Sequence, residues 1–331
     1  MPRRPPRPRR VVAAVGLLVA AVAVAVAVTV STSTARQADD AGGPTSTSTS
    51  TPGRHPDVTD RPSSTPSPEP TSSAAAEPAP STGADGTGVG GTGAGAGVAP
   101  NGSGQAMPTS SGPGWTRTFS DDFAHPVAAG RFPGRYDDSW VAYDGFTDTS
   151  GIGDYRADAV SVRDGVLDLA VSAGDGAVTS AAVVPLVGGE WGGQVHGRFS
   201  VRMRADAVPG FYAAFLLWSD GNDWDDGEVD FPEGRLDGTV RGYNHTPGDP
   251  SVNSFVGDTG ISFDGWHTYT IEWRPDRIDY LVDDRVWATT SEALPTASMH
   301  WVMQVEAAGE TPPDGAGHVE IDWATIDRYD G

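Results

Sequence analysis

Aromatic residues are confined to one part of this 331-residue chain, and this limits where a folded domain can form. No Phe, Tyr or Trp precedes Trp115. Because large apolar side chains supply most of the buried surface of a globular core, residues 1–112 cannot build one. Residues 113–331 hold all ten Trp and enough apolar surface for a single domain.

The first 35 residues have the pattern of an export signal. Several Arg residues precede an apolar run from Val11 to Val30. At ~1.5 Å per residue, a helix over this run would cross a ~30 Å hydrocarbon layer. The run is mostly Ala and Val, however, and Ser33-Thr34-Ala35 is typical of a small-residue cleavage site. We therefore predict a signal peptide or a membrane anchor over residues 1–35, with both alternatives open, and an extracellular or cell-surface location for the rest.

Residues 36–112 are rich in Ser, Thr, Pro, Gly and Ala. This composition predicts a disordered linker between the export segment and a domain over residues 113–331.

The charge and the Cys content exclude several classes of function. The formal net charge is −22, and every basic residue other than His is Arg. Such an acidic chain repels phosphate backbones, so we expect no nucleic-acid partner. The chain has no Cys, which excludes disulfides and thiolate catalysis.

The pattern beyond residue 112 predicts an all-β fold. Short alternating runs are separated by Gly, Asp, Asn and Pro, and we find no 3.6-residue apolar stripe. Asp164-Gly165 and Asp283-Asp284 each lie between two such runs and predict hairpin turns. We expect further strands around residues 194–205, 211–218, 226–233, 239–245, 267–273, 299–306 and 318–328. So many strands without an internal repeat favour a jelly-roll sandwich over a propeller.

The most informative segment is the acidic run Gly227–Gly234. In a strand, Glu228 and Asp230 share one face while the apolar residues between and after them point into the core. Pro232 cannot donate to a sheet ladder and predicts a bulge. One extra residue there would return Glu233 to the face of the other two acids.

Three carboxylates this close cannot all ionise, so at least one retains its proton. A protonated carboxyl beside an ionised one is the pair that a retaining glycosidase uses, at a separation of ~5–5.5 Å. The alternative reading is an ordinary solvated acidic strand in an acidic protein.

The run Glu228-Val229-Asp230-Phe231-Pro232-Glu233 resembles the Glu-x-Asp-x-x-Glu signature of glycoside hydrolase family 16, in its bulged, laminarinase-like form. The resemblance extends to the flanking segments 119–123, 197–204, 266–269 and 319–323. It implies a concanavalin-like β-jelly roll with a cleft across its concave sheet. It also implies Glu228 as nucleophile, Asp230 as the residue that tunes it, and Glu233 as acid/base.

Five further residues are candidates for substrate binding. Trp224 is a large aromatic in an Asp-rich loop, where its indole could stack on a sugar ring. Arg202 lies on the polar face of an alternating strand, and its counterpart in the family lines the cleft. Tyr212 matches a family Trp, His245 matches a cleft His, and Gln304 stands where the family often has Asn.

We expect no cofactor for catalysis. The His residues of the domain lack paired ligand spacing, which argues against catalytic zinc. Asp122 and Asp322 match positions that hold a structural calcium ion on the convex face of many relatives.

These observations predict an exported, monomeric endo-glycosidase that retains configuration and cleaves a β-linked polysaccharide, with 1,3-β-glucan as the favoured substrate. The membrane would be contacted through the N-terminal segment alone. A carbohydrate-binding module without catalysis and a transglycosylase that remodels a cell-wall polysaccharide are the alternatives.

Overall fold

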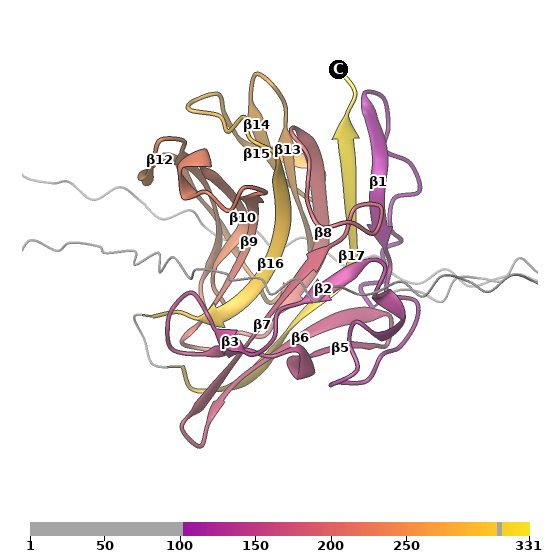
Figure 1. Ribbon diagram of the computed structural model, residues 1–331, viewed down its shortest axis with the longest axis vertical. Coiled ribbons are helices and arrows are strands. Elements are labelled where there is room, and N and C mark those ends of the chain that lie inside the picture. Colours follow the sequence, from indigo (N-terminus) through magenta and orange to yellow (C-terminus); the bar gives the residue numbers. More distant parts are fainter. Residues whose placement is uncertain (1–101, 310–312) are drawn as a thin grey trace, which may run out of the picture. The chain divides into compact units, whose positions relative to one another are not determined.

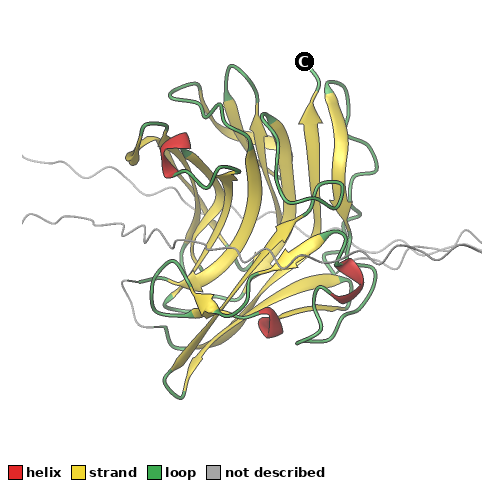
Figure 2. Cartoon of the chain, viewed as in Figure 1, coloured by secondary structure: helices red, strands yellow, loops and turns green. Residues whose placement is uncertain are grey.

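The computed structural model describes residues 102–309 and 313–331, which form two packed β-sheets (Figures 1 and 2). The predictions for residues 1–35 and for most of the linker lie outside the described residues. Within the described ranges, none of the helices is long and apolar enough to span a membrane.

Sheet A is built around its longest strand, β17, which pairs with β8 along one edge and with β6 and then β1 along the other. Its strands are β1 (Trp115–Asp121), β5 (Val160–Arg163), β6 (Val166–Gly174), β8 (Gly197–Ala205), β13 (His267–Trp273), β14 (Ile278–Val282), β15 (Arg285–Thr290) and β17 (Gly315–Tyr329), with the two-residue strands β3 (Phe146–Thr147) and β4 (Asp154–Tyr155) at its margin.

Sheet B forms the opposite layer, and the β6–β7 hairpin joins the two sheets. Its strands, in spatial order, are β12 (Asp249–Ser262), β11 (Thr239–Thr246), β10 (Glu228–Arg235), β9 (Phe211–Ser219), β16 (Met299–Ala307), β7 (Ala177–Pro185) and β2 (Trp140–Ala142). In Figure 1, β9, β10 and β16 curve past one side of the core and β1, β8 and β17 form the other. The described helices are the short 3-10 turns η1 (Gly134–Tyr136), η2 (Ala157–Ala159) and η3 (Trp224–Asp226).

The core lies between the two sheets and follows the period-2 alternation of their strands. Phe199 of β8 in sheet A meets Trp301 of β16 in sheet B edge to face, with ring centroids 5.8 Å apart. Phe231 of β10 is buried and stacks on Trp287 of β15 at 5.7 Å. Because the inner positions are apolar, the intervening residues of each strand point outward, and both sheets have a polar outer face. The predicted all-β sandwich is confirmed.

Both predicted hairpins are present. Asp164 and Gly165 have φ of 52° and 79° between β5 and β6. Asp283 and Asp284 have φ of 48° and 62° between β14 and β15. Positive φ at both central residues is what a type I′ turn requires, because its twist matches that of the flanking strands.

The start of the domain differs from the predicted boundary at residue 113. The Ser103 hydroxyl hydrogen-bonds to the carboxylate of Asp322, and the Arg202 Nε donates to Ser103 at 2.7 Å. Ser111 donates to Asp327 at 2.8 Å. Contacts with the outer face of sheet A therefore begin at Ser103, inside the predicted linker.

Candidate active site

The acidic strand is β10, and its register places the acids on the outer face of sheet B. Glu228 pairs with His245 on β11, and Asp230 pairs with Leu216 on β9. Val229, between the two acids, is fully buried in the core. Because neighbouring residues of a strand alternate between faces, both carboxylates point away from the core.

The predicted bulge at Pro232 is confirmed. From Asp230 to Glu233 the chain advances three residues, whereas its partner on β9 moves from Leu216 to Ala214. The same shift occurs against β11. The extra residue brings Glu233 back to the outer face of sheet B, so all three acids share it. The Phe231–Pro232 peptide bond is cis.

Asp230 is the most buried of the three acids, with 1% of its surface exposed. Its Oδ2 lies 3.3 Å from Nε2 of His245. The other ring nitrogen, Nδ1, lies 2.8 Å from the carbonyl oxygen of Pro250, to which it donates when it carries hydrogen. Burial lowers the pKa of His245, but its hydrogen bond and ion pair with Asp230 outweigh burial, and the net pKa is raised.

Glu228 has a pKa well above its ordinary value, because the site is buried and because the charges of Asp230 and Glu233 oppose a further charge. The ligand-type atoms of Glu228, Asp230 and His245 lie within 4.8 Å of one another. Among the described residues, this is the group of carboxylates and imidazole that could hold a metal ion. Such crowding accounts for the retained proton that the sequence predicts.

Glu233 also has a raised pKa, with burial as the largest cause and the charge of Asp230 as the next. Two neighbours act in the opposite direction. The hydroxyl of Tyr212 donates to Oε1 of Glu233 at 2.7 Å, and Arg241 adds a positive charge; both lower the pKa. The site thus holds two Glu carboxyls with elevated proton affinity on one face, which suits one as an acid and the other as an ionised nucleophile.

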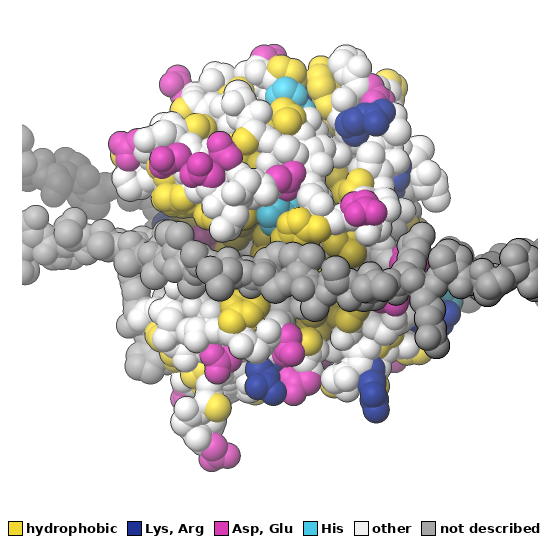
Figure 3. Space-filling view, in the orientation of Figure 1, with side chains coloured by type: hydrophobic (Ala, Val, Ile, Leu, Met, Phe, Trp, Pro, Cys, Tyr) yellow, Lys and Arg dark blue, Asp and Glu magenta, His cyan; other side chains and the backbone are white. Residues whose placement is uncertain are grey.

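Aromatic rings continue the site beyond the acids. Trp224 of η3 is half-buried and lies 5.0 Å from the ring of His245. Its other neighbour is Trp218 of β9, which stacks on it at 5.7 Å and 24°. The sequence analysis did not single out Trp218, although its alternation with Tyr212 on β9 was a usable signal. Figure 3 shows acidic side chains gathered at this end of the fold, where η3 and β12 lie.

A fourth acid, Glu306 of β16, is buried on the same face and was not predicted. It accepts hydrogen bonds from the backbone N–H of Thr149 at 3.1 Å and from the Tyr155 hydroxyl at 2.7 Å. Burial raises the pKa of Glu306. Gln304, two residues earlier, is buried on this face too and lies 3.2 Å from the Tyr155 hydroxyl. The structure therefore brings Tyr212, Trp224, His245 and Gln304 to the face of the acids.

Arg202 is the exception, and its predicted place in the cleft is wrong. It lies on β8, between Thr268 of β13 and Trp323 of β17, on the outer face of sheet A. Its guanidinium contacts Ser103 and Thr268, and the whole residue is buried, with 8% of its surface exposed. Strand alternation showed correctly that Arg202 points away from the core. It did not show to which of the two sheets its strand belongs.

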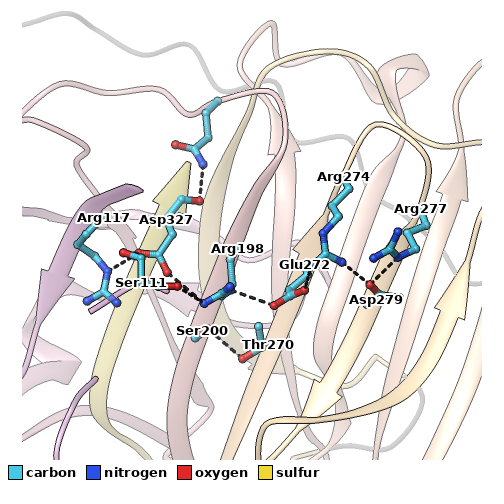
Figure 4. A network of polar contacts seen from close by, with 11 residues as sticks. Ser111, Arg117, Arg198, Ser200, Thr270, Glu272, Arg274, Arg277, Asp279 and Asp327 are labelled. Carbon is cyan, nitrogen blue, oxygen red and sulfur yellow. Dashed lines mark hydrogen bonds and ion pairs between the residues drawn. The ribbon is translucent and has the colours of Figure 1, made fainter. Parts of the chain in front are cut away.

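The outer face of sheet A carries a ladder of ion pairs in place of a catalytic group (Figure 4). Asp327 of β17 contacts Arg117 and Arg198, and Arg198 pairs with Glu272 of β13 at 3.0 Å. Arg274 continues the ladder from Glu272 to Asp279 of β14. Each charge has an opposite neighbour, so this face is stabilised by its own side chains.

One of the two predicted calcium ligands, Asp322, lies at this face as well. Asp322 is buried; one oxygen accepts from Ser103, and the other lacks a partner among the described residues. Neither Asp122 nor Asp322 belongs to a group of three or more His, Asp or Glu in the described ranges that could enclose an ion. A Ca²⁺ ion takes 6–8 oxygen ligands, so the two aspartates would not suffice, and the calcium site stays a prediction.

Comparison with known proteins relates part of this chain to glycoside hydrolases. Residues 192–325 match the family model of glycosyl hydrolases family 16. A β-glucanase of Acetivibrio thermocellus is 33% identical over 94 residues, 27% of this chain and 28% of that protein. A glucan endo-1,3-β-glucosidase of Cryptopygus antarcticus is 29% identical over 108 residues, 29% of this chain and 40% of that protein. The matches thus span less than half of these relatives.

A solved structure shows the same fold over a larger share of the chain. The laminarinase of Rhodothermus marinus superposes with a TM-score of 0.52 at 21% identity, covering 65% of this chain and 98% of that one. The segment matched by the family includes β10, with its three acids and its bulge, and the neighbouring strands of sheet B. Over residues 192–325, this chain is thus similar to glycosyl hydrolases family 16.

Proposed function

We propose that this protein is a retaining endo-glycosidase that cleaves a β-linked polysaccharide, with 1,3-β-glucan as its substrate. The observation that carries the proposal is the placement of Glu228 and Glu233 on one face of β10, with Asp230 between them and the pKa of both Glu residues raised. The match to the family model adds independent support.

In the proposed mechanism each of the two Glu residues has its own step. Ionised Glu228 attacks the anomeric carbon while Glu233 transfers its proton to the glycosidic oxygen, and the bond between that carbon and oxygen breaks. Glu233 then takes a proton from water as the water oxygen displaces Glu228 from the same carbon. Two displacements restore the β configuration, and no cofactor takes part.

The names of similar proteins favour a glucan. They include β-glucanases, a glucan endo-1,3-β-glucosidase and a laminarinase. The stacked rings of Trp218 and Trp224 beside His245 offer a flat apolar surface for a sugar ring next to the acids.

The full chain should be incubated with 1,3-β-glucan, mixed-linkage β-glucan and β-galactan, and the products sized. We expect rapid shortening of the 1,3-β-glucan and, by proton NMR, a β-anomer as first product. An α-anomer would mean inversion, and products longer than the substrate would mean transglycosylation. Full activity of Glu228→Gln would refute Glu228 as nucleophile, and binding of a polysaccharide without any cleavage would leave a binding module.

The covalent step has its own test in Glu228→Ala with added azide. Azide should partly restore turnover and give the α-glycosyl azide, because it attacks once from the side that the carboxylate vacates. A β-glycosyl azide would contradict Glu228 as nucleophile.

We also propose that the protein is exported and acts outside the cytosol, on the strength of the Arg-rich start and the apolar run in residues 1–35. Cells that express the full chain should show the domain accessible to external protease or in the medium. A protease-protected cytosolic domain would refute export, and N-terminal sequencing would separate a cleaved signal from an anchor.

A further inference from the structure

Tyr212 makes a contact with Glu233 that a sugar-stacking role does not explain. Tyr212 lies on β9 next to Arg235, and its hydroxyl reaches along the outer face of sheet B to Oε1 of Glu233 at 2.7 Å. A phenol has one hydrogen to donate, and burial and the nearby Glu233 charge raise the pKa of Tyr212. The hydroxyl therefore keeps its proton and remains a donor.

The two oxygens of Glu233 differ in their surroundings. Oε1 accepts from Tyr212, whereas Oε2 is buried and has no hydrogen-bond partner among the described residues. A carboxyl proton on Oε1 would compete with the phenol hydrogen at the same oxygen. The transferable proton is thus favoured on Oε2, the oxygen that has no competing hydrogen bond among the described residues.

A second phenol and a guanidinium act on the same part of the site. Tyr243 of β11 is among the groups that raise the pKa of Tyr212. The Tyr243 hydroxyl accepts from the Arg241 guanidinium at 3.3 Å, and Arg241 pairs with Asp258 of β12 at 3.4 Å. The charge of Arg241 also lowers the pKa of Glu233, in the same direction as the Tyr212 hydrogen bond.

We propose that Tyr212 is a positioning residue for Glu233: its hydroxyl holds Oε1 and so leaves Oε2 to carry the proton that Glu233 transfers to the glycosidic oxygen. The inference rests on the proposed function, in which Glu233 is the acid. The family position usually holds Trp, so this contact belongs to the present chain and not to the shared signature.

Several charged or titratable groups face Glu233, and all remain in place when only the Tyr212 hydroxyl is removed. They are Glu228, Asp230 and Arg235 on β10, Arg241, Tyr243 and His245 on β11, and Glu306 on β16. Tyr212→Phe therefore isolates the contribution of one hydrogen bond.

The experiment compares Tyr212→Phe with Tyr269→Phe in the full chain. Tyr269 is buried in the core, and its hydroxyl has no hydrogen-bond partner in the described part of the chain, so its loss controls for removal of a phenol oxygen. For Tyr212→Phe we expect kcat to fall roughly 10-fold to 100-fold with KM nearly unchanged. The alkaline limb of kcat/KM should move to higher pH by about one unit, because the lost donor lowered the pKa of Glu233.

A raised KM with an unmoved pH profile would overturn the inference and return Tyr212 to sugar binding. Equal kinetics of Tyr212→Phe and wild type would overturn it as well. Tyr243→Phe should give the same effects at smaller size, because it acts through Tyr212.

A readout without substrate separates this inference from the proposed function. The carboxyl carbon of Glu233, labelled with ¹³C and assigned by its loss in Glu233→Gln, should titrate at higher pH in Tyr212→Phe than in wild type. An unmoved titration refutes the contact whatever the activity. A moved titration in a protein that cleaves none of the polysaccharides refutes the proposed function and, with it, the positioning role.

Discussion

His245 and Asp230 form an ion pair across neighbouring strands, with Nε2 of the imidazole 3.3 Å from Oδ2 of the carboxylate. Asp230 also lies between Glu228 and Glu233, and its charge raises the pKa of both. When His245 is protonated, its positive charge offsets part of the negative charge of Asp230 that Glu228 and Glu233 experience. The charge of Asp230 thus raises the pKa of Glu228, Glu233 and His245 alike.

Asp230→Asn should shift the pH profile of kcat/KM toward acid. Loss of the Asp230 charge removes the second-largest cause of the raised pKa of Glu228 and of Glu233, so both limbs should move to lower pH by about one unit. Peak activity should fall less than in Glu228→Gln, because Asp230 tunes its neighbours and forms no bond to the sugar. Asp175→Asn, an exposed change in the β6–β7 turn, is the matched control. Unchanged acid and alkaline limbs of the pH profile in Asp230→Asn would contradict the effect of the Asp230 charge on Glu228 and Glu233.

His245→Gln should destabilise the protein mainly at low pH. The folded pKa of His245 is raised above its ordinary value of 6.5, so the protonated imidazole contributes stability below pH 6.5. That contribution is lost as pH rises through the folded pKa. Melting temperatures of wild type and variant, measured from pH 5 to 9, should therefore converge with rising pH. A gap that widens with pH would rule out a charged His245.

Trp224→Ala should lower kcat/KM roughly 10-fold to 100-fold through lost stacking on the sugar, with little change in melting temperature. Trp266→Ala is the control, since Trp266 is also half-buried but lies under Arg204 on sheet A. Steady-state kinetics on the best polysaccharide decide between the roles. Unchanged kinetics with a large fall in melting temperature would make Trp224 a packing residue.

Asp327→Ala should weaken the fold and spare catalysis. Asp327 is 1% exposed and contacts Arg117, Arg198 and Ser111, so its removal takes the carboxylate partner from Arg117 and leaves Arg198 paired with Glu272. We expect the free energy of unfolding in urea to fall by about 2 kcal/mol. The exposed pair Arg328–Asp330 gives the comparison, and Asp330→Ala should lower the free energy of unfolding much less, because water screens this pair. A large loss of kcat in Asp327→Ala would link the two outer faces.

Local chemistry made much of this structure predictable from sequence. Pro232 forced a bulge because it cannot donate to the ladder, and the bulge fixed the face of Glu233. Asp164-Gly165 fixed a hairpin because both residues accept positive φ. Strand β12 was missed, since its Gly, Asp, Ser and Pro residues suggest loop, and it is held as an edge by β11 alone.

Relations between distant segments could not be predicted in this way. Arg202 was placed in the wrong sheet because alternation orders residues within a strand and says nothing about which strands become neighbours. The contact between Tyr212 and Glu233 depends on the pairing of β9 with β10 and on the reach of a phenol, neither of which appears in the sequence pattern.

The first described residues of the chain lie against the outer face of sheet A. Ser103 and Ser111 are fastened to the outer face of sheet A, while the acids occupy the outer face of sheet B. In the described part of the chain, the segment from Ser103 to Ser111 therefore adds to the covered face of sheet A and not to the face that carries the three acids.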